Sequence, residues 1–251
     1  MEVHQHSHLA SGETHTARKK WTHYFWEFLM LFLAVFCGFM AENQREHMIE
    51  HKREKQFMVS MINDLRLDMA WLDTVNISAG QRIKNIKAAL KQFVNRQDDL
   101  MPVAAYDQLR KSAAQIMFFS NDGTMTQLKN SGGMRLIRKR EVVDKIEAYD
   151  RLMRRLEVRR TVTIKTAQDF VEVLNRAFIG KDLLTAYYDS SFVVKNINSG
   201  YTRLDKANVN DLINQCIALR MRVVADTTAN ASIKREAATL VEFIQNKYHL
   251  N

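Results

Sequence analysis

Basic side chains are the residues of this sequence whose types and spacing best suit ligand binding. Arg151, Arg155 and Arg159 recur every four residues, which places them on one face of a helix. Another basic run follows two glycines, where the free amides of a helix N-terminus would add to the attraction for an anion. A solvated basic face is the alternative interpretation, and because no aromatic residues alternate with the arginines, we expect no nucleic acid partner. The predicted anion patch comprises Arg135, Arg138, Lys139, Arg140, Arg151, Arg155 and Arg159.

Histidines offer a second chemistry, the binding of a transition metal. His4, His6 and His8 alternate near the N-terminus without carboxylate or thiol support, and His47 and His51 stand one helical turn apart without an indicated third ligand. We therefore interpret these histidines as solvated and predict no metal site. The sequence also lacks a glycine-rich phosphate loop, a Cys-x-x-Cys pair and a His-Glu-x-x-His motif. We predict that the protein is not an enzyme and has neither catalytic residues nor a cofactor.

Glu27 is the third candidate, because it is the one acidic residue in a long apolar run. An ionisable group in a membrane segment is a functional hypothesis in itself, although Glu27 could instead lie at the interface and pair with Lys20 or His23. Two alanines follow it at seven-residue steps, on nearly the same helix face, and a small-xxx-small pair lets two membrane helices approach closely. We therefore predict a homo-oligomer held partly by a contact that comprises Glu27, Ala34, Gly38 and Ala41.

Residues 21–41 are the segment around which the chain is organised. From residue 28 onward no charged side chain interrupts the apolar run, and about 20 helical residues cross a hydrocarbon core of roughly 30 Å. Aromatic residues and three basic residues precede the run, as at a membrane interface. A buried core helix would need a polar face, and a cleaved signal peptide would end in a small-residue site. We predict a transmembrane helix that contacts the lipid bilayer.

Two segments of the chain resemble a known family. The run RKKWTHYFWEFLMLFLAVFCGFMAENQREH, residues 18–47, resembles the N-terminus of a family of uncharacterised single-pass membrane proteins of Gram-negative bacteria. The run LKNSGGMRLIRKREVVDKI, residues 128–146, is similar to a second hallmark of that family. The resemblance covers most of the chain and implies one membrane helix followed by an α-helical soluble domain. It implies no catalytic residue.

Composition limits the fold in three ways. One proline and eight glycines in 251 residues favour long helices with few breaks. Cys37 and Cys216 lie in unrelated segments, so we predict no disulfide framework. The net charge is +9, and residues 134–180 hold twelve Lys/Arg against seven Asp/Glu. The positive excess therefore lies inside the soluble domain rather than beside the membrane segment.

Apolar residues at alternating steps of four and three predict the helices that position these candidates. The first continues from the membrane segment to about residue 76, and others cover residues 79–97, 103–118, 138–178 and 206–247, the last with a break or bend near residues 226–230. We expect an all-α fold in which a single N-terminal transmembrane helix continues into a long stalk helix and an antiparallel helical bundle. One core is predicted to contain Ile62, Leu65, Ile146, Tyr149, Leu156 and Leu240.

The predicted organisation has four parts. Residues 1–20 form a disordered histidine-containing tail, residues 21–41 the transmembrane helix, residues 42–56 a charged helical stalk and residues 57–251 the helical bundle domain. Three basic residues precede the span without acidic neighbours, which favours a cytoplasmic N-terminus and a periplasmic C-terminal domain at the inner membrane.

The function predicted from these features is that of a non-enzymatic, membrane-anchored helical interaction or scaffold protein of the bacterial envelope, with another envelope protein as its partner. Two alternatives stay open: a periplasmic ligand-sensing bundle that acts through a partner, and a membrane-tethered module that binds nucleic acid or another anion.

Overall fold

Two compact units make up the chain in the computed structural model, which describes residues 17–95, 99–188 and 200–250. They are Met1–Arg53 and Glu54–Asn251. The predicted all-α architecture is confirmed. Helix α1 (Ala17–Asn95) begins within the predicted tail, and the histidines at positions 4, 6, 8 and 15 lie outside the described residues.

The first unit holds the apolar part of α1. Its side chains are exposed from Trp21 to Ile49, with Leu29 alone half-buried among them. Within the part of the chain that is described, α1 is the one helix long and apolar enough to cross a membrane, by length and composition. Such an exposed apolar run is what the sequence predicted for residues 21–41.

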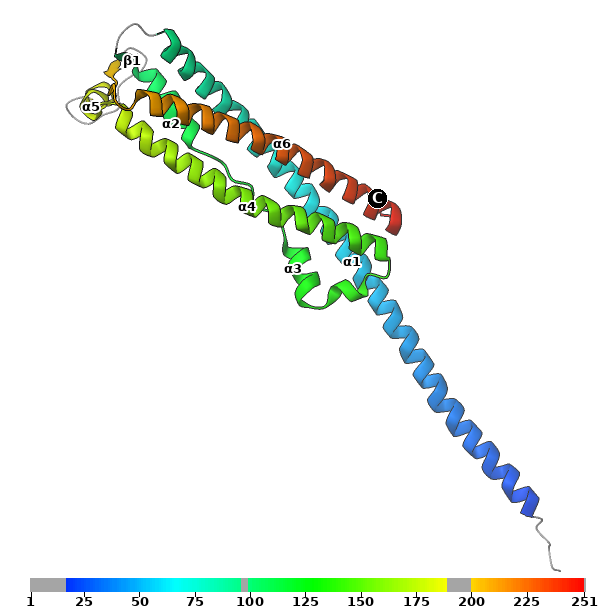
Figure 1. Cartoon of the computed structure of the whole chain (residues 1–251). Helices are drawn as coiled ribbons and strands as arrows, with labels where there is room; N and C mark the ends of the chain where they lie inside the picture. Colours follow the sequence, from blue (N-terminus) through cyan, green and yellow to red (C-terminus); the bar gives the residue numbers. More distant parts are fainter. Residues whose placement is uncertain (1–16, 96–98, 189–199, 251) are drawn as a thin grey trace, which may run out of the picture. The chain divides into compact units, whose positions relative to one another are not determined.

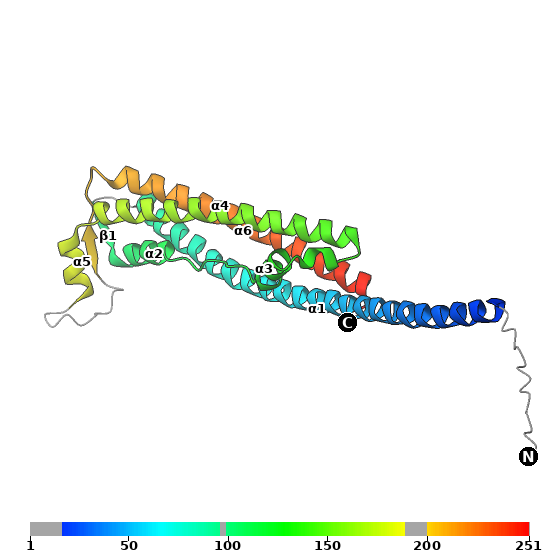
Figure 2. The same ribbon diagram turned by 90° about the horizontal axis from the view of Figure 1, so that it is seen from below.

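The second unit contains the rest of α1 and two further long helices. Figures 1 and 2 show α4 (Arg140–Ala177) and α6 (Val209–Tyr248) side by side and antiparallel, with α1 running in the direction of α4. Shorter elements complete the unit: α2 (Val103–Ala113), α3 (Gly123–Asn130), the 3-10 turn η1 (Gly133–Leu136) and α5 (Gly180–Tyr187). Strands β1 (Leu100–Pro102) and β2 (Tyr201–Arg203) pair antiparallel, with Leu100 opposite Arg203.

Three predicted boundaries were wrong. Helix α1 has no break between residues 76 and 79, so two predicted helices are one, and α6 is continuous through residues 226–230. Asp226 and Asn230 do not interrupt α6, because both have partners: Asp226 pairs with Arg159 of α4 and with Arg222 of α6 itself, and the Asn230 side chain donates to Asn76 Oδ1 of α1 at 3.1 Å. Helix α2 ends at Ala113 rather than at residue 118.

The buried apolar residues of the second unit form two clusters. Cluster one contains Ile62, Leu65, Ile146, Tyr149 and Leu240, so the predicted core is confirmed for these five, while Leu156 is half-buried and packs against them. Cluster two contains residues of the other half of each long helix, together with residues of β1 and α2 and Leu204, which follows β2. Among its members are Ile86, Leu109, Phe170, Leu174, Leu212 and Leu219. The same three helices thus carry two separate apolar cores.

A connecting segment, residues 114–122, runs without regular secondary structure between α2 and α3. Side chains of α1 hold its backbone: Trp71 Nε1 donates to Met117 O at 3.1 Å, and Asp68 Oδ1 accepts from Asn121 N at 2.7 Å. The end of α2 is held in the same way, because Arg82 Nε donates to Ser112 O at 2.8 Å. Helix α1 therefore fixes the path of the segment.

Candidate functional site

The seven residues of the predicted anion patch lie along η1, the short link that follows it, and α4. Two of these side chains form exposed ion pairs with a carboxylate one helical turn away. Arg140 lies 3.1 Å from Asp144, and Arg151 lies 3.9 Å from Glu147. The backbone amide of Arg138 donates to the buried Glu54 carboxylate, and Lys139 Nζ lies 4.5 Å from the centroid of the Tyr248 ring. Arg135 and Arg155 are exposed, and Arg159 joins a network described below. These side chains do not line the pocket that lies between α1, α4, α6 and the connecting segment.

The predicted contact residues of the membrane segment, Glu27, Ala34, Gly38 and Ala41, are exposed on α1. Further along the same helix, His47 Nδ1 lies 3.8 Å from Glu50 Oε2. The described residues include no group of three side chains that could hold a metal ion.

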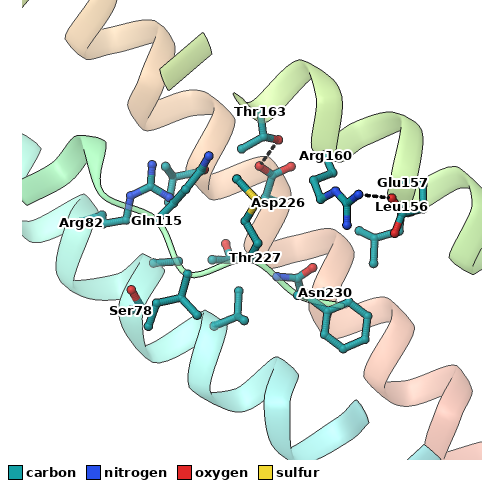
Figure 3. Close-up of a pocket in the computed structure, with 16 residues that line it drawn as sticks. Ser78, Arg82, Gln115, Leu156, Glu157, Arg160, Thr163, Asp226, Thr227 and Asn230 are labelled. Atoms are coloured by element: carbon teal, nitrogen blue, oxygen red, sulfur yellow. Dashed lines mark hydrogen bonds and ion pairs between the residues drawn. The ribbon is translucent and has the colours of Figure 1, made fainter. Parts of the chain in front are cut away.

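A pocket of about 70 Å³ opens between α1, α4, α6 and the connecting segment. It lies where the two clusters meet, because Val75 and Phe118 of cluster one and Ala79 and Val223 of cluster two all line it. Figure 3 shows Arg82 and Arg160 on opposite sides of the pocket, with Thr227 between them. The lining is therefore mixed, with apolar side chains such as Val75 and Leu156 beside polar ones, and with a guanidinium group at each of the two sides.

Arg82 is the most unusual group in the pocket, because its side chain carries a charge and is only 8% exposed. Its Nε bonds to the Ser112 carbonyl, while its Nη2 is buried and has no hydrogen-bond partner within the described chain. Burial lowers the pKa of Arg82, and the carboxylate of Asp226 opposes that shift. Since an arginine in a protein stays protonated, the unpaired nitrogen is a charged donor without an acceptor.

Asp226 does not bond to that nitrogen, and its carboxylate is held by three other groups. Arg222 Nη2 and Arg159 Nη2 lie 3.1 and 3.3 Å from its Oδ1, and Thr163 Oγ1 donates to its Oδ2 at 2.8 Å. Arg222 also donates through Nε to Thr163 Oγ1 at 2.9 Å and through Nη2 to Arg159 O at 2.8 Å. A polar network thus joins α4 to α6 beside the pocket.

Arg160 completes the set of cations. Its Nη2 lies 2.7 Å from Glu157 Oε2, and its guanidinium stacks 4.6 Å from the centroid of the Phe119 ring. Its Nη1 is buried and unpaired among the described residues. Four guanidinium groups, of Arg82, Arg159, Arg160 and Arg222, therefore face two carboxylates, of Glu157 and Asp226, which leaves an excess of two positive charges at this level of the bundle.

Polar residues within two apolar seams are the sequence feature that indicates this site, and they are not part of the predicted anion patch. Arg160 and Thr163 interrupt the apolar seam of α4, and Asp226 and Asn230 interrupt that of α6. Buried polar side chains need hydrogen-bond partners, and polar residues in two apolar seams can supply them to each other. The two interruptions therefore indicate a polar layer shared by α4 and α6.

Comparison with protein-family models, with curated proteins and with solved structures found no match to this chain.

Proposed function

We propose that the chain is a non-enzymatic, membrane-anchored helical interaction protein of the bacterial envelope. The observation that carries the proposal is the exposure of the apolar side chains of residues 21–41 on a helix. A folded chain in water rarely leaves so large an apolar surface uncovered, whereas a bilayer covers it. Lipid is thus the first expected partner.

The chemistry of the polar groups favours binding over catalysis. Arginines have no accessible neutral form, and Asp226 is held by two guanidinium groups and a hydroxyl. Arginine side chains fixed in this way can hold a partner or a ligand, but they do not serve as general acids or bases.

Membrane insertion is tested by one substitution with a matched control. A charge at the centre of a span costs about 2.5–3.5 kcal/mol, so Phe32→Arg should release much of the protein from membranes washed with alkaline carbonate. The control is Leu67→Arg, which puts the same charge at an exposed position of α1 in the second unit. Equal extraction of the two variants would contradict the anchor.

Orientation is tested by reporter fusions at Asn251. We propose a cytoplasmic N-terminus and a periplasmic C-terminal domain at the inner membrane, which requires a periplasmic reporter to be active and a cytoplasmic one to be silent. The reverse pattern would contradict this topology.

Self-association through the membrane segment is part of the same proposal. A face with Glu27, Ala34 and Ala41 would place the carboxylate between helices rather than in lipid. A cysteine at Ala34, in a chain whose Cys37 is replaced by serine, should cross-link into dimers or larger species within membranes. A monomeric product at every position scanned from 27 to 41 would exclude this contact.

A second candidate function is favoured by the pocket between α1, α4 and α6. A cavity with unpaired charged donors supports a ligand-sensing bundle that acts through a partner protein. Membrane anchoring is compatible with both candidates, because the pocket lies wholly within the second unit.

A further inference from the structure

We infer that this pocket binds a small organic carboxylate of two to four carbon atoms, whose oxygens bond to Arg82. The inference rests on the second candidate function, ligand sensing, and names its ligand class. It does not depend on the membrane anchor.

Arg82 Nη2 is a buried, charged donor without a hydrogen-bond partner among the described residues. A buried hydrogen-bonding group without a partner destabilises a protein, and the effect is larger for a charged group, so a site that keeps one is suited to an acceptor from outside. The Arg82 side chain is held in place by its Nε bond to Ser112 O and by the bundle around it. A fixed guanidinium favours a planar carboxylate, whose two oxygens match its geometry.

Charge favours the same class of ligand. Arg160, on the opposite side of the pocket, has a second unpaired nitrogen, and its carboxylate partner Glu157 neutralises only one charge (Figure 3). Asp226 forms its ion pairs with Arg159 and Arg222. It offsets the charge of Arg82 only by a longer-range Coulomb attraction, without a hydrogen bond. The excess of positive charge would attract an anion and repel a cation.

Size and lining select among anions. A dry cavity of about 150 Å³ in another protein admits benzene, so a volume of 70 Å³ suits a ligand with few heavy atoms. Val75, Ala79, Leu156 and Val223 would surround an alkyl group, whereas a phosphate would present charged oxygens to these walls. The lining therefore favours a short alkyl carboxylate over inorganic phosphate.

Entry requires a side chain to move, because Arg82 Nη2 is buried. Gln115 is the suitable one: it lies on the connecting segment, is half-buried, and lines both this pocket and the neighbouring cavity along with Arg82. Its rotation would expose the guanidinium from that side without any shift of a helix.

The test uses the full chain in a mild non-ionic detergent, with sodium propionate as the probe and sodium chloride at equal ionic strength as the reference. A ligand that binds the folded state raises the unfolding temperature in a saturable way. We expect such a rise with propionate, and we expect Arg82→Met to weaken propionate binding at least about 30-fold, as when a buried charged partner is removed. Arg66→Met, which removes the same charge from an exposed position of α1, should leave binding unchanged.

The Arg82→Met variant should fold, because an apolar side chain of similar length in place of an unpaired buried charge is often neutral or stabilising. If it does not, Arg160→Met at the half-exposed side provides the second variant, with an expected weakening of about 3- to 10-fold. Propionate without an effect beyond chloride, or equal binding by Arg82→Met, would overturn the inference. A larger rise with phosphate than with propionate would overturn the ligand class. Membrane extraction is measured separately, so neither result is confused with loss of the anchor.

Discussion

Cluster one and cluster two lie in the same bundle but are held together in different ways. Around cluster one, carboxylates are buried: Asp68 accepts from the Asn121 backbone and from Tyr149 Oη, and Glu54 accepts from Tyr248 Oη at 2.5 Å. Around cluster two, carboxylates pair with cations: Asp182 does so with Arg203 at 2.8 Å, and the buried Asp107 does so with Arg110 at 3.1 Å. Cluster one thus depends on desolvated polar groups that fix its loops, and cluster two on apolar packing bordered by ion pairs.

This difference shows why a pocket occurs at the junction. Val75 of cluster one and Ala79 of cluster two both line the pocket, but polar side chains, among them Arg82 and Arg160, leave a gap in the apolar packing there. The polar network of Asp226 fills part of the gap, and the pocket is what remains.

The largest effects should come from truncating each core in turn. Phe170→Ala in cluster two should destabilise the protein by about 3–5 kcal/mol, and Ile146→Ala in cluster one by about 2–5 kcal/mol, because both side chains are fully buried. Each is measured by denaturant unfolding in a chain whose tryptophans at positions 21 and 26 are replaced by phenylalanine, so that Trp71 reports on the bundle.

Because α1, α4 and α6 run through both clusters, we expect one cooperative transition. Labelling of Cys216, a buried thiol of cluster two whose pKa burial raises to about 12, gives the second probe once Cys37 is replaced. Midpoints that differ between Trp71 fluorescence and Cys216 labelling would mean that the clusters unfold separately.

Asp226→Asn tests the network at the junction. It leaves Arg159 and Arg222 with reduced compensation in a partly buried site, so we expect a loss of about 2–3 kcal/mol, typical of hydrogen bonds to charged groups. Glu236→Gln, an exposed change of the same kind on α6, is the control and should shift the midpoint by less than about 0.5 kcal/mol. Equal effects of the two changes would show that the network adds nothing.

Asp68→Ala tests the buried polar contacts of cluster one. The substitution leaves the Asn121 amide and the Tyr149 hydroxyl without their acceptor, for an expected loss of about 1–3 kcal/mol. Asn121 is the last residue but one of the connecting segment, so amide hydrogen exchange around residues 118–124 should also become faster. Unchanged exchange there would place the effect elsewhere.

Between about pH 2 and neutral pH, the contributions of Asp68 near cluster one and Asp182 near cluster two to stability should change with pH in opposite directions. Burial raises the pKa of Asp68, so the folded state binds its proton more readily, and the contribution of Asp68 to stability falls as pH rises from about 3.9 toward the raised value. The hydrogen bond from the Arg203 side chain lowers the pKa of Asp182 to about 2, so its contribution is present above about pH 3.9 and is lost as pH falls toward 2.

The measurement is the free energy of unfolding against pH for the wild type, for Asp68→Asn and for Asp182→Asn. The difference between wild type and variant should change with pH in opposite directions for the two positions. Slopes of the same sign would show that the carboxylates do not divide between the regions as described.

The smallest effect is expected at the surface of cluster one. Lys234 Nζ lies 2.6 Å from Asp73 Oδ1 and joins α6 to α1, but both side chains are substantially exposed. Lys234→Met should therefore cost about 0.2–1 kcal/mol at low salt and less at high salt. A larger loss that persists in 1 M salt would point to packing by the lysine stem instead.

The long helices could be predicted from the sequence because their apolar seams are regular. Leu212, Cys216, Leu219 and Val223 recur at steps of four and three, and all are buried in α6. The continuity of α1 past residue 76 was missed because Ser78 and Gly80 weaken helix propensity locally, whereas packing of Val75 and Ala79 outweighs that preference. Strands of three residues carry no periodic pattern, so the β1–β2 pair could not be predicted.

The pocket was harder to predict than the helices. Arg160, Thr163 and Asp226 are visible in the sequence as interruptions of two seams, but their meeting depends on how far α4 is shifted along α6. That offset depends on the path of the chain through α5 and β2, which no residue spacing reveals. Arg82 is harder still, because its partner is a backbone carbonyl, which leaves no trace in side-chain identity.

The way in which the connecting segment is held affects which of its residues can be substituted during evolution. Trp71 and Asp68 grip the segment by its main chain, at Met117 O and Asn121 N, so the identities of Gln115 and Ile116 matter little for its path. Both residues nevertheless line the pocket. Mutations at these two positions would therefore alter what enters the cavity while leaving the bundle intact. Substitutions at these positions could change which ligand is preferred without the loss of folding stability that usually accompanies changes in a binding site.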